Sequence, residues 1–417
     1  MADRRGGAGL TLALLALACA SPEMAPGGAV PVTRVPEIRI GIVVGGASMS
    51  IGGGEALRIA GADGGSGETV DVPAGVIATI APARAGLEVR FPGGGPPISL
   101  GPSVNLAAVD SGAAIRLLGR EYRGTAEITA TSQGVLAANI LDIEEYLAGV
   151  VGAEMGRRGE QDLSALRAQA VVSRTIAVKN LGRWRLRGYD LLATVADQAY
   201  AGKSFETPTA MQAVEETRGE IVTFQGLPID AFFHSTCAGR TAAGTEVFAA
   251  AERPYLRAIR DVKDDGQAWC AISPRFRWSE RWTGEVLART LRETLPLVGG
   301  SAEMSASLTD LRVLDLTATG RVARFEVAGG SSSLTLTGPQ ARILLRTPDG
   351  AMLRSANFNL QVSREGGRIV QLTAEGGGAG HGVGMCQWGA LGRARVGFSY
   401  QDILSAYFPG TEVGRFY

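Results

Sequence analysis

Two segments of the chain carry side chains able to do acid–base or ligand chemistry. The first is Gly380–Ala390, which holds His381, Cys386, Gln387 and Trp388. Six glycines lie among residues 376 to 384, so the backbone can take left-handed conformations and let another group approach closely. The segment lacks the Gly-Lys-Ser/Thr ending and the strand-to-helix context of a nucleotide-binding loop. Two interpretations stay open. The segment is either a ligand-binding loop or a glycine-rich hairpin whose histidine makes its hydrogen bonds within the protein.

The second segment is a predicted helix over residues 141–155 that carries a carboxylate near its end. Its apolar face follows i, i+4, i+7 spacing, with Ile143, Leu147 and Val150 as members. Glu154 takes the next position on this face, where burial and the helix dipole both raise a carboxyl pKa. A glutamate with a raised pKa can serve as general acid near neutral pH. The alternative is an ordinary ion pair with Arg157, Arg158 or Arg174.

A second helical pattern, over residues 161–184, supplies plausible partners for such an acid. Its apolar stripe consists of Leu163, Leu166, Ala170, Ala177 and Leu181. Gln169 and Ser173, four residues apart, lie with Arg174 on a neighbouring polar face. This face is either solvated helix surface or part of a site for a polar, oxygen-rich ligand.

The surrounding elements predict an α+β fold. Asp142 is a suitable N-cap for the first helix, and Glu145 could complete a capping box. Short β-branched runs punctuated by Gly and Pro make residues 37–138 a β-rich N-terminal region, and strand patterns return over residues 306–374. We therefore expect a β-rich N-terminal region, central helices carrying the acid, and a β-rich C-terminal part with a glycine-rich active-site loop. The last two would form one core over residues 139–417.

The N-terminus resembles a bacterial lipoprotein signal. Arg4 and Arg5 precede a short apolar run that ends at Leu17-Ala18-Cys19, which is too short for a transmembrane helix. We expect a signal peptide over residues 1–18, lipid attachment at Cys19, and a flexible linker over residues 19–36. The chain would then act in the cell envelope, outside the cytoplasmic membrane, held by its lipid anchor. A plain secretory signal is the alternative.

Composition limits the partners and the cysteine chemistry. The 41 basic and 41 acidic residues give zero formal net charge, which argues against nucleic-acid binding through a basic field. Besides Cys19, the chain has Cys237, Cys270 and Cys386. This odd number allows at most one disulfide within the chain and leaves one thiol or ligand.

Five ordered motifs together resemble the stage II sporulation protein D family, also described as the amidase-enhancer family. They span residues 146–155, 165–175, 197–202, 233–241 and 380–390. The resemblance runs from about residue 37 to the C-terminus. It implies a lytic transglycosylase that cleaves denuded peptidoglycan glycan strands between N-acetylmuramic acid and N-acetylglucosamine, without a cofactor. Glu154 falls on the family's catalytic glutamate.

The resemblance also implies how one carboxyl group suffices. Glu154 would protonate the glycosidic oxygen and then accept the proton of the muramoyl C6 hydroxyl, which closes a 1,6-anhydro ring. Paired carboxylates, as in most glycoside hydrolases, are not needed. Other motif positions, assigned to substrate binding or site support, are Gln169, Arg174, Gln198, Tyr200, Ser235, His381 and Gln387. Trp388 would stack on a sugar or pack in the core.

A non-catalytic role stays open beside the enzymatic one. The family's second name implies a peptidoglycan-binding protein that enhances a separate N-acetylmuramoyl-L-alanine amidase. A glutamate on the apolar face favours the enzyme, because a binding module has no need to bury an acid.

The chain departs from the zinc site of some sporulation members. Leu192, Ala196 and Asp197 stand where Cys, His and Cys would be, so that site is absent. By residue type and number, His234, Cys237, Cys270 and Cys386 could instead form a different set of four tetrahedral metal ligands. We expect instead no metal, with a Cys237–Cys270 disulfide and a reduced Cys386, since Cys270 alone of the three lies outside the family motifs.

Overall fold

The computed structural model describes residues 34–62, 69–248 and 252–417. These residues form two compact units, one of residues 34–233 with 387–417 and one of residues 234–386. Helices and strands are mixed throughout, which confirms the predicted α+β class. The predicted signal peptide and Cys19 lie outside the described residues. No helix in the described part of the chain combines the length and apolar composition needed to cross a membrane.

The first unit begins with strands, as the β-branched runs predict. In chain order they are β1 (Glu37–Gly46), β2 (Met49–Gly52), β3 (Leu57–Gly61), β4 (Val70–Val72), β5 (Ala78–Ala83), β6 (Gly86–Arg90), β7 (Ile98–Leu100), β8 (Ser103–Ala108), β9 (Ile115–Leu117), β10 (Arg120–Tyr122), β11 (Thr125–Thr131) and β12 (Gly134–Asp142). Alternate side chains are buried, for example Ile38 and Ile40 on β1 and Leu57 and Ile59 on β3. This period of two is that of a half-buried strand.

The strands form two sheets that pack on one another. With β13 (Leu191–Leu192), one sheet has the order β13-β1-β12-β11-β8-β3-β4, and the other has the order β10-β9-β2-β5-β6-β7. Strand β5 of the second sheet contacts β11 and β12 of the first. β1 and β12 are antiparallel, with Glu37 opposite Asp142. The last strand of this region therefore delivers the chain directly to the first helix.

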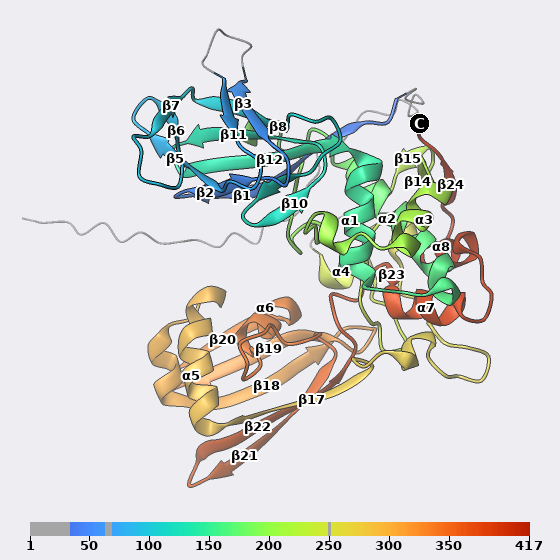
Figure 1. The fold of residues 1–417 in the computed structure, drawn as a ribbon. Helices are drawn as coiled ribbons and strands as arrows, with labels where there is room; N and C mark the ends of the chain where they lie inside the picture. Colours follow the sequence, from blue (N-terminus) through green and yellow to red (C-terminus); the bar gives the residue numbers. More distant parts are fainter. Residues whose placement is uncertain (1–33, 63–68, 249–251) are drawn as a thin grey trace, which may run out of the picture. The chain divides into compact units, whose positions relative to one another are not determined.

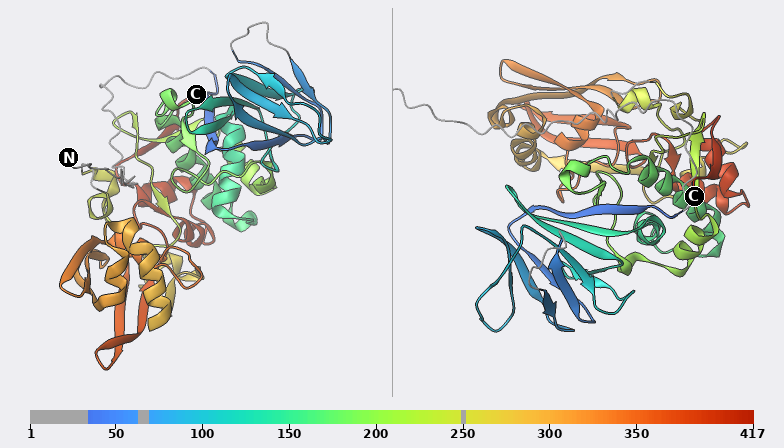
Figure 2. Two further views of the ribbon diagram at one scale, coloured as in Figure 1. Left: turned by 90° about the vertical axis from the view of Figure 1, so that its left-hand side faces the viewer. Right: turned by 90° about the horizontal axis from the view of Figure 1, so that it is seen from above.

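The helices of the first unit gather beyond one end of β1 and β12 (Figures 1 and 2). They are α1 (Ile143–Met155), η1 (Glu160–Asp162), α2 (Leu163–Lys179), η2 (Arg185–Arg187), η3 (Lys203–Phe205), α3 (Pro208–Glu216), α7 (Gln387–Ala394) and α8 (Tyr400–Tyr407). A small sheet has the order β15-β14-β24, formed by β14 (Glu220–Phe224), β15 (Leu227–Pro228) and β24 (Glu412–Arg415). Although more than 200 residues separate them in sequence, α7 packs beside α2 (Figure 1).

Helix α1 starts where the N-cap was predicted. The Asp142 side chain accepts a hydrogen bond from the Glu145 N–H at 2.8 Å, which satisfies one of the donors that a helix start leaves unpaired. A capping box would also need a hydrogen bond from the Asp142 N–H to the Glu145 side chain. The described helix start has no such bond, so the predicted capping box is incomplete. At the other end, the Gly156 N–H donates to the Gly152 carbonyl with Gly156 in a left-handed conformation (φ 70°).

The second unit is an inserted α+β module with its own core. Its elements, together with the boundary strand β16 (Phe233–His234), are α4 (Gly244–Val247), η4 (Pro254–Leu256), η5 (Trp269–Ile272), β17 (Arg277–Thr283), α5 (Gly284–Thr294), η6 (Leu295–Val298), η7 (Ala302–Ser307), β18 (Leu308–Leu316), β19 (Val322–Gly329), β20 (Ser332–Thr337), α6 (Gly338–Leu344), β21 (Phe358–Glu365), β22 (Arg368–Gly377) and β23 (Met385–Cys386). Strands β17, β22 and β21 form one sheet, and β18, β19 and β20 form another.

The core of this module explains why the predicted single core over residues 139–417 divides. Trp282, Leu291, Phe325, Leu344 and Leu372 are fully buried within one cluster of the second unit. Helix α5 packs against β17 and β22, while α6 packs against β19 and β20 (Figure 1). A segment that buries its own apolar surface in this way forms a separate compact unit. The strand patterns within residues 306–374 are confirmed by β18 to β22.

Candidate active site

Glu154 lies in the last turn of α1 with its side chain half-buried. Its Oε1 atom accepts a hydrogen bond from the Ala199 backbone N–H at 2.8 Å, and the Gln387 side chain also hydrogen-bonds the carboxylate. Among the described residues it has no ion-pair partner, unlike the alternative the sequence left open. Arg158 instead donates its Nε–H to the Met155 carbonyl at 2.7 Å. The carboxylate is thus held in place by amide donors without being neutralised by a cation.

Burial raises the pKa of the Glu154 carboxyl above its usual range. The hydrogen bonds from Ala199 and Gln387 oppose this shift, because they favour the charged form, but they are smaller than the desolvation effect. The direction agrees with the prediction from the apolar helix face. A carboxyl group with a raised pKa keeps its proton closer to neutral pH and can donate it to a leaving group.

A chain of amides connects the acid to α2 and α7. The Gln387 Nε2 group donates to Gln169 Oε1 at 3.3 Å, and Gln169 Nε2 donates to Ser173 Oγ at 3.0 Å. Gln169 and Ser173 are fully buried, and Gln387 nearly so, so the polar face of the second helix is interior rather than solvated surface. Gln387 contacts the carboxylate, whereas Gln169 acts on it through Gln387.

Gln198 and Tyr146 extend this polar network. Gln198 Nε2 donates to Tyr146 Oη at 3.3 Å and to the Ser173 carbonyl at 3.4 Å. The Gln198 Oε1 atom is buried without a hydrogen-bond partner in the part of the chain that the structure describes. Gln198 is fully buried, so it supports the site from within the protein.

Tyr200 is part of a buried aromatic group beneath the site. Its hydroxyl donates to Asn139 Oδ1 at 2.9 Å, and its ring packs edge-on against Tyr146 with centroids 4.9 Å apart. Asn139 donates in turn to the carbonyls of Arg123 and Thr125. Burial raises the pKa of Tyr200 well above its usual range, so this hydroxyl stays protonated. These contacts make Tyr200 a supporting residue, not a surface for substrate.

Arg174 makes internal contacts, of the kind expected for the site-support alternative. It is fully buried, and its guanidinium makes a two-pronged ion pair with Glu144 at 2.7 and 3.0 Å. Its remaining donors reach the carbonyls of Val214 and Glu220. The sequence does not indicate this role for Glu144, because the helical pattern gives no sign that an acid in the first turn faces inward.

Trp388 lies at the start of α7, half-buried. The Arg158 guanidinium lies over its ring, 4.9 Å from the centroid, in a cation–π arrangement. One face of the indole is therefore covered by a protein side chain. The same arginine binds the end of α1, so Trp388 also helps hold the helix that carries Glu154.

Ser235 and His381 belong to the second unit. Ser235 is half-buried, with its Oγ atom 3.3 Å from Thr236 Oγ1. His381 is half-buried, and its Nδ1 atom accepts from the Val383 N–H at 3.1 Å. The glycines beside it are needed: Gly380 (φ 96°) and Gly382 (φ 89°) have left-handed backbones that L side chains rarely adopt.

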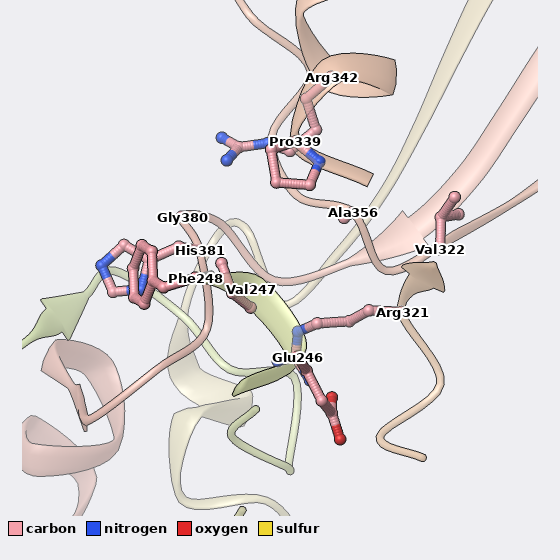
Figure 3. Close-up of a pocket in the computed structure, with 10 residues that line it drawn as sticks. All are labelled: Glu246, Val247, Phe248, Arg321, Val322, Pro339, Arg342, Ala356, Gly380 and His381. Atoms are coloured by element: carbon pink, nitrogen blue, oxygen red, sulfur yellow. The ribbon is translucent and has the colours of Figure 1, made fainter. Parts of the chain in front are cut away.

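His381 lines a pocket of about 180 Å³ in this unit (Figure 3). Its ring lies beside that of Phe248, with centroids 5.4 Å apart (Figure 3). Arg321 and Arg342 also line the pocket. Arg342 donates to the backbone carbonyls of Leu353 and Arg354, and burial lowers its pKa to about 10. The glycine-rich loop thus forms part of a cavity whose lining carries two guanidinium groups and the carboxylate of Glu246.

The expected Cys237–Cys270 disulfide is not formed. Their Sγ atoms are 3.5 Å apart, whereas a disulfide bond is about 2.05 Å long. Cys386 and the carboxylate of Asp261 join the two thiols in one buried cluster. His234, the fourth member of the set conceived from sequence, is not in it; its Nδ1 lies 3.1 Å from the Val383 carbonyl. Local sequence spacing does not identify Asp261 as a member of this cluster, because it lies 24 residues beyond Cys237.

The Asp197 carboxylate holds together the turn of residues 192–197. Its carboxylate accepts from the Leu192 backbone N–H at 2.8 Å and pairs with Arg183 at 3.0 Å. The hydrogen bond closes the turn, and the ion pair fastens the turn to Arg183 in the segment that follows α2. Gln198 and Ala199, which follow directly, reach Tyr146 and Glu154.

Together these contacts describe a candidate acid–base site with a single carboxylate: one half-buried glutamate, held by amide donors and backed by a buried polar network on an α+β scaffold. The chain belongs to the stage II sporulation protein D family. The family model described as stage II sporulation protein matches residues 131–224, which include Glu154, Gln169 and Gln198. A second model, described as a domain of unknown function, matches residues 268–384 within the inserted module.

Curated relatives agree with this assignment. The chain is 30% identical to stage II sporulation protein D of Bacillus subtilis over 289 residues, which cover 66% of this chain and 74% of that protein. It is 30% identical to the amidase enhancer of Bacillus subtilis over 297 residues, or 64% of this chain and 40% of that protein. An uncharacterized protein of Brachyspira hyodysenteriae is 30% identical over 301 residues, covering 71% and 73%.

Proposed function

We propose that this protein is a peptidoglycan lytic transglycosylase in which Glu154 is the acid and the base. The observation that carries the proposal is the state of this side chain: half-buried, with a raised pKa, held by amide donors, and without a cation. A carboxyl group bound to a structural cation would be locked in its charged form. Glu154 is instead suited to give up and regain a proton.

The proposed reaction needs two proton transfers at one residue. Protonated Glu154 donates its proton to the oxygen that links C1 of N-acetylmuramic acid to N-acetylglucosamine, and the C1–O bond breaks as positive charge develops at C1. The carboxylate then accepts the proton of the muramoyl C6 hydroxyl while O6 bonds to C1. The products are a 1,6-anhydromuramoyl end and a free N-acetylglucosamine hydroxyl. Glu154 ends protonated, ready for another turnover.

Gln387 is the residue best placed to manage the change in charge. Its side-chain amide contacts the Glu154 carboxylate and is itself held by Gln169. An N–H donor to a carboxylate stabilises the charged form that exists after the first transfer. We assign Gln387 to the acid–base step and Gln169, Gln198 and Tyr200 to support of the site.

Ser235 and His381 would bind substrate within the inserted unit itself, since both are half-buried and His381 lines a pocket of that unit. A muramoyl residue stripped of its peptide carries a lactyl carboxylate. The guanidinium groups of Arg321 and Arg342 in the same lining would suit an anion of that kind. The glycan strands, and an envelope location with a lipid anchor on Cys19, belong to the same proposal.

Digestion of purified, peptide-free glycan strands tests the proposal. The wild-type chain should release products with the mass of 1,6-anhydro ends, and Glu154→Gln should lose about 10²–10⁴-fold in turnover while still binding glycan. Glu145→Gln is the matched control, because it makes the same exchange in the first turn of the same helix. Undiminished anhydro products from Glu154→Gln would rule out the assigned role.

The name of one relative favours a second candidate, an enhancer of a separate N-acetylmuramoyl-L-alanine amidase. In that case the wild-type chain would cleave no glycan but would stimulate an amidase acting on intact peptidoglycan. The Glu154→Gln variant would then stimulate as well as the wild type. The two readouts separate the enzyme from the enhancer.

A further inference from the structure

We propose that Cys237, Cys270, Cys386 and Asp261 bind a structural zinc ion within the inserted unit. The four side chains are buried, and their ligand atoms, three Sγ and one carboxylate oxygen, all lie within 4.8 Å of one another. They converge from four separate stretches of sequence. Neither the acid–base site nor any step of the proposed reaction uses them.

The distances fit a tetrahedral ion better than a disulfide. Zinc binds thiolate sulfur at about 2.3 Å, so two sulfurs of one tetrahedron lie roughly 3.8 Å apart. Cys237 Sγ lies 3.5 Å from Cys270 Sγ and 3.2 Å from Asp261 Oδ2. A disulfide would use two of the thiols and leave the third with a carboxylate in the same buried space. One divalent cation engages all four groups at once.

The backbone around Cys237 is shaped to support thiolates. Ala238 has a left-handed conformation (φ 63°), and Gly239 follows it with φ 100°. This turn directs the Gly239 N–H to Cys237 Sγ at 3.3 Å, and the Cys237 N–H lies 3.2 Å from Cys386 Sγ. Amide donors aimed at sulfur stabilise negative charge on it. Left-handed backbone at a non-glycine residue is unfavourable and persists where the surroundings enforce it.

The position of the cluster in the chain gives the ion a structural role. Cys270 lies at the start of the segment matched by the domain of unknown function, residues 268–384, and Cys386 lies just past its end. Cys237 and Asp261 lie in the segment before it. Within this unit a zinc ion would therefore fasten both ends of the inserted domain to the residues that precede it. Such an ion contributes directly to the free energy of folding.

A closed set of three thiolates and one carboxylate selects the metal. Thiolate ligands favour zinc, copper(I) and iron–sulfur clusters over magnesium or calcium. A closed protein ligand set is the arrangement of structural zinc sites, whereas catalytic zinc keeps a position for water.

Metal content of the full chain decides the matter. We would carry the Cys19→Ala change in every variant, so that only these three thiols remain, and purify without chelator. Elemental analysis should find about one zinc per chain, and cobalt(II) should give the thiolate charge-transfer and tetrahedral d–d absorption of a sulfur-rich site. Cys270→Ser and Asp261→Asn should lower the zinc content. Asp264→Asn, in the exposed part of the same loop, should keep it.

Two results would overturn the inference. One is a chain that retains no zinc and gives no tetrahedral cobalt spectrum when titrated. The other is a Cys237–Cys270 disulfide in non-reducing peptide maps of protein isolated from an envelope compartment. If Cys270→Ser fails to fold, the metal content and cobalt spectrum of the parent chain still decide. This test does not measure glycan cleavage, so its outcome is independent of the proposed function.

Discussion

At the scale of single residues, the position of Glu154 follows from the helical pattern, but its environment does not. The i, i+4, i+7 spacing predicts a carboxylate on an apolar face. The structure adds the partners that set its charge, the Ala199 N–H and the Gln387 side chain, which come from segments 45 and 233 residues away. A general acid needs this balance, because burial alone would hold the proton and prevent the later base step.

The raised pKa of Glu154 predicts two pH dependences of known sign. Activity requires the protonated acid, so kcat/KM should fall as pH rises through this raised value, later than for an ordinary glutamate. For stability, a raised folded-state pKa costs nothing below the unfolded value. The cost builds up as pH rises from the unfolded value to the raised folded value, and it is complete above the folded value. Glu154→Gln should therefore unfold at higher temperature than wild type near neutral pH and at the same temperature in acid; equal melting temperatures at all pH values would contradict this.

A change at Gln387 tests how the Glu154 carboxylate is positioned, which a change at Glu154 itself cannot do. Gln387→Ala removes a donor that lowers the pKa of Glu154, so the alkaline limb of the kcat/KM profile should move to higher pH. A hydrogen bond to a charged group is worth about 1.5–3 kcal/mol, so kcat should fall by roughly ten- to a hundredfold. Gln387→Glu is the comparison variant, since it keeps the shape and adds a like charge. A lower kcat with an unmoved pH profile would mean that Gln387 only fills space.

At the scale of elements, α1 is placed by two glycines on one face. Gly149 and Gly152 lie three residues apart and let the segment from Tyr200 to Phe205 approach the helix closely. A Cβ atom on Gly152 would clash with the Phe205 carbonyl oxygen, while one on Gly149 would lie 3.0 Å from the Tyr200 ring. This close approach aligns the same stretch of chain that supplies Ala199 to the acid.

Gly152→Ala should therefore destabilise the protein despite its better helix propensity. The gain in propensity is about 1 kcal/mol, and the backbone displacement costs more, so we expect a net loss of about 1–3 kcal/mol in the free energy of unfolding. Gly149→Ala should lose less, because a tyrosine ring can shift more readily than a backbone carbonyl. Chemical denaturation of both variants gives the comparison. A more stable Gly152→Ala protein would show that the helix packs differently.

The sequence predicts these elements better than their contacts. The strands of residues 37–138, the Asp142 N-cap and the two central helices all follow from local periodicity and capping chemistry. The Glu144–Arg174 ion pair does not, because charged residues on a helix are usually solvated and only tertiary packing turns this pair inward. The sequence suggests the three thiols as one possible set, but with His234 as the fourth member, because no local spacing brings in Asp261.

At the scale of the whole molecule, the inserted unit lies between two of the five motifs, whose order along the chain is kept. The motif at residues 233–241 enters it and the motif at residues 380–390 leaves it, so a domain with its own core lies between two motifs of one family. An insertion of this kind is tolerated where entry and exit of the chain lie close together. The bridge between Thr236 and Ala379 shows that they do.

The predicted location of the protein rests on N-terminal residues that lie outside the described part of the chain. The n-region of Arg4 and Arg5, the short apolar run and Leu17-Ala18-Cys19 predict lipid attachment at Cys19. In a bacterial host, mass spectrometry should find the mature N-terminus at an acylated Cys19, and the protein should partition with membranes. Cys19→Ala should remove the acyl mass and release the chain from the membrane fraction. An unmodified N-terminus at another residue would instead indicate a plain secretory signal, and the protein would then act without a lipid tether.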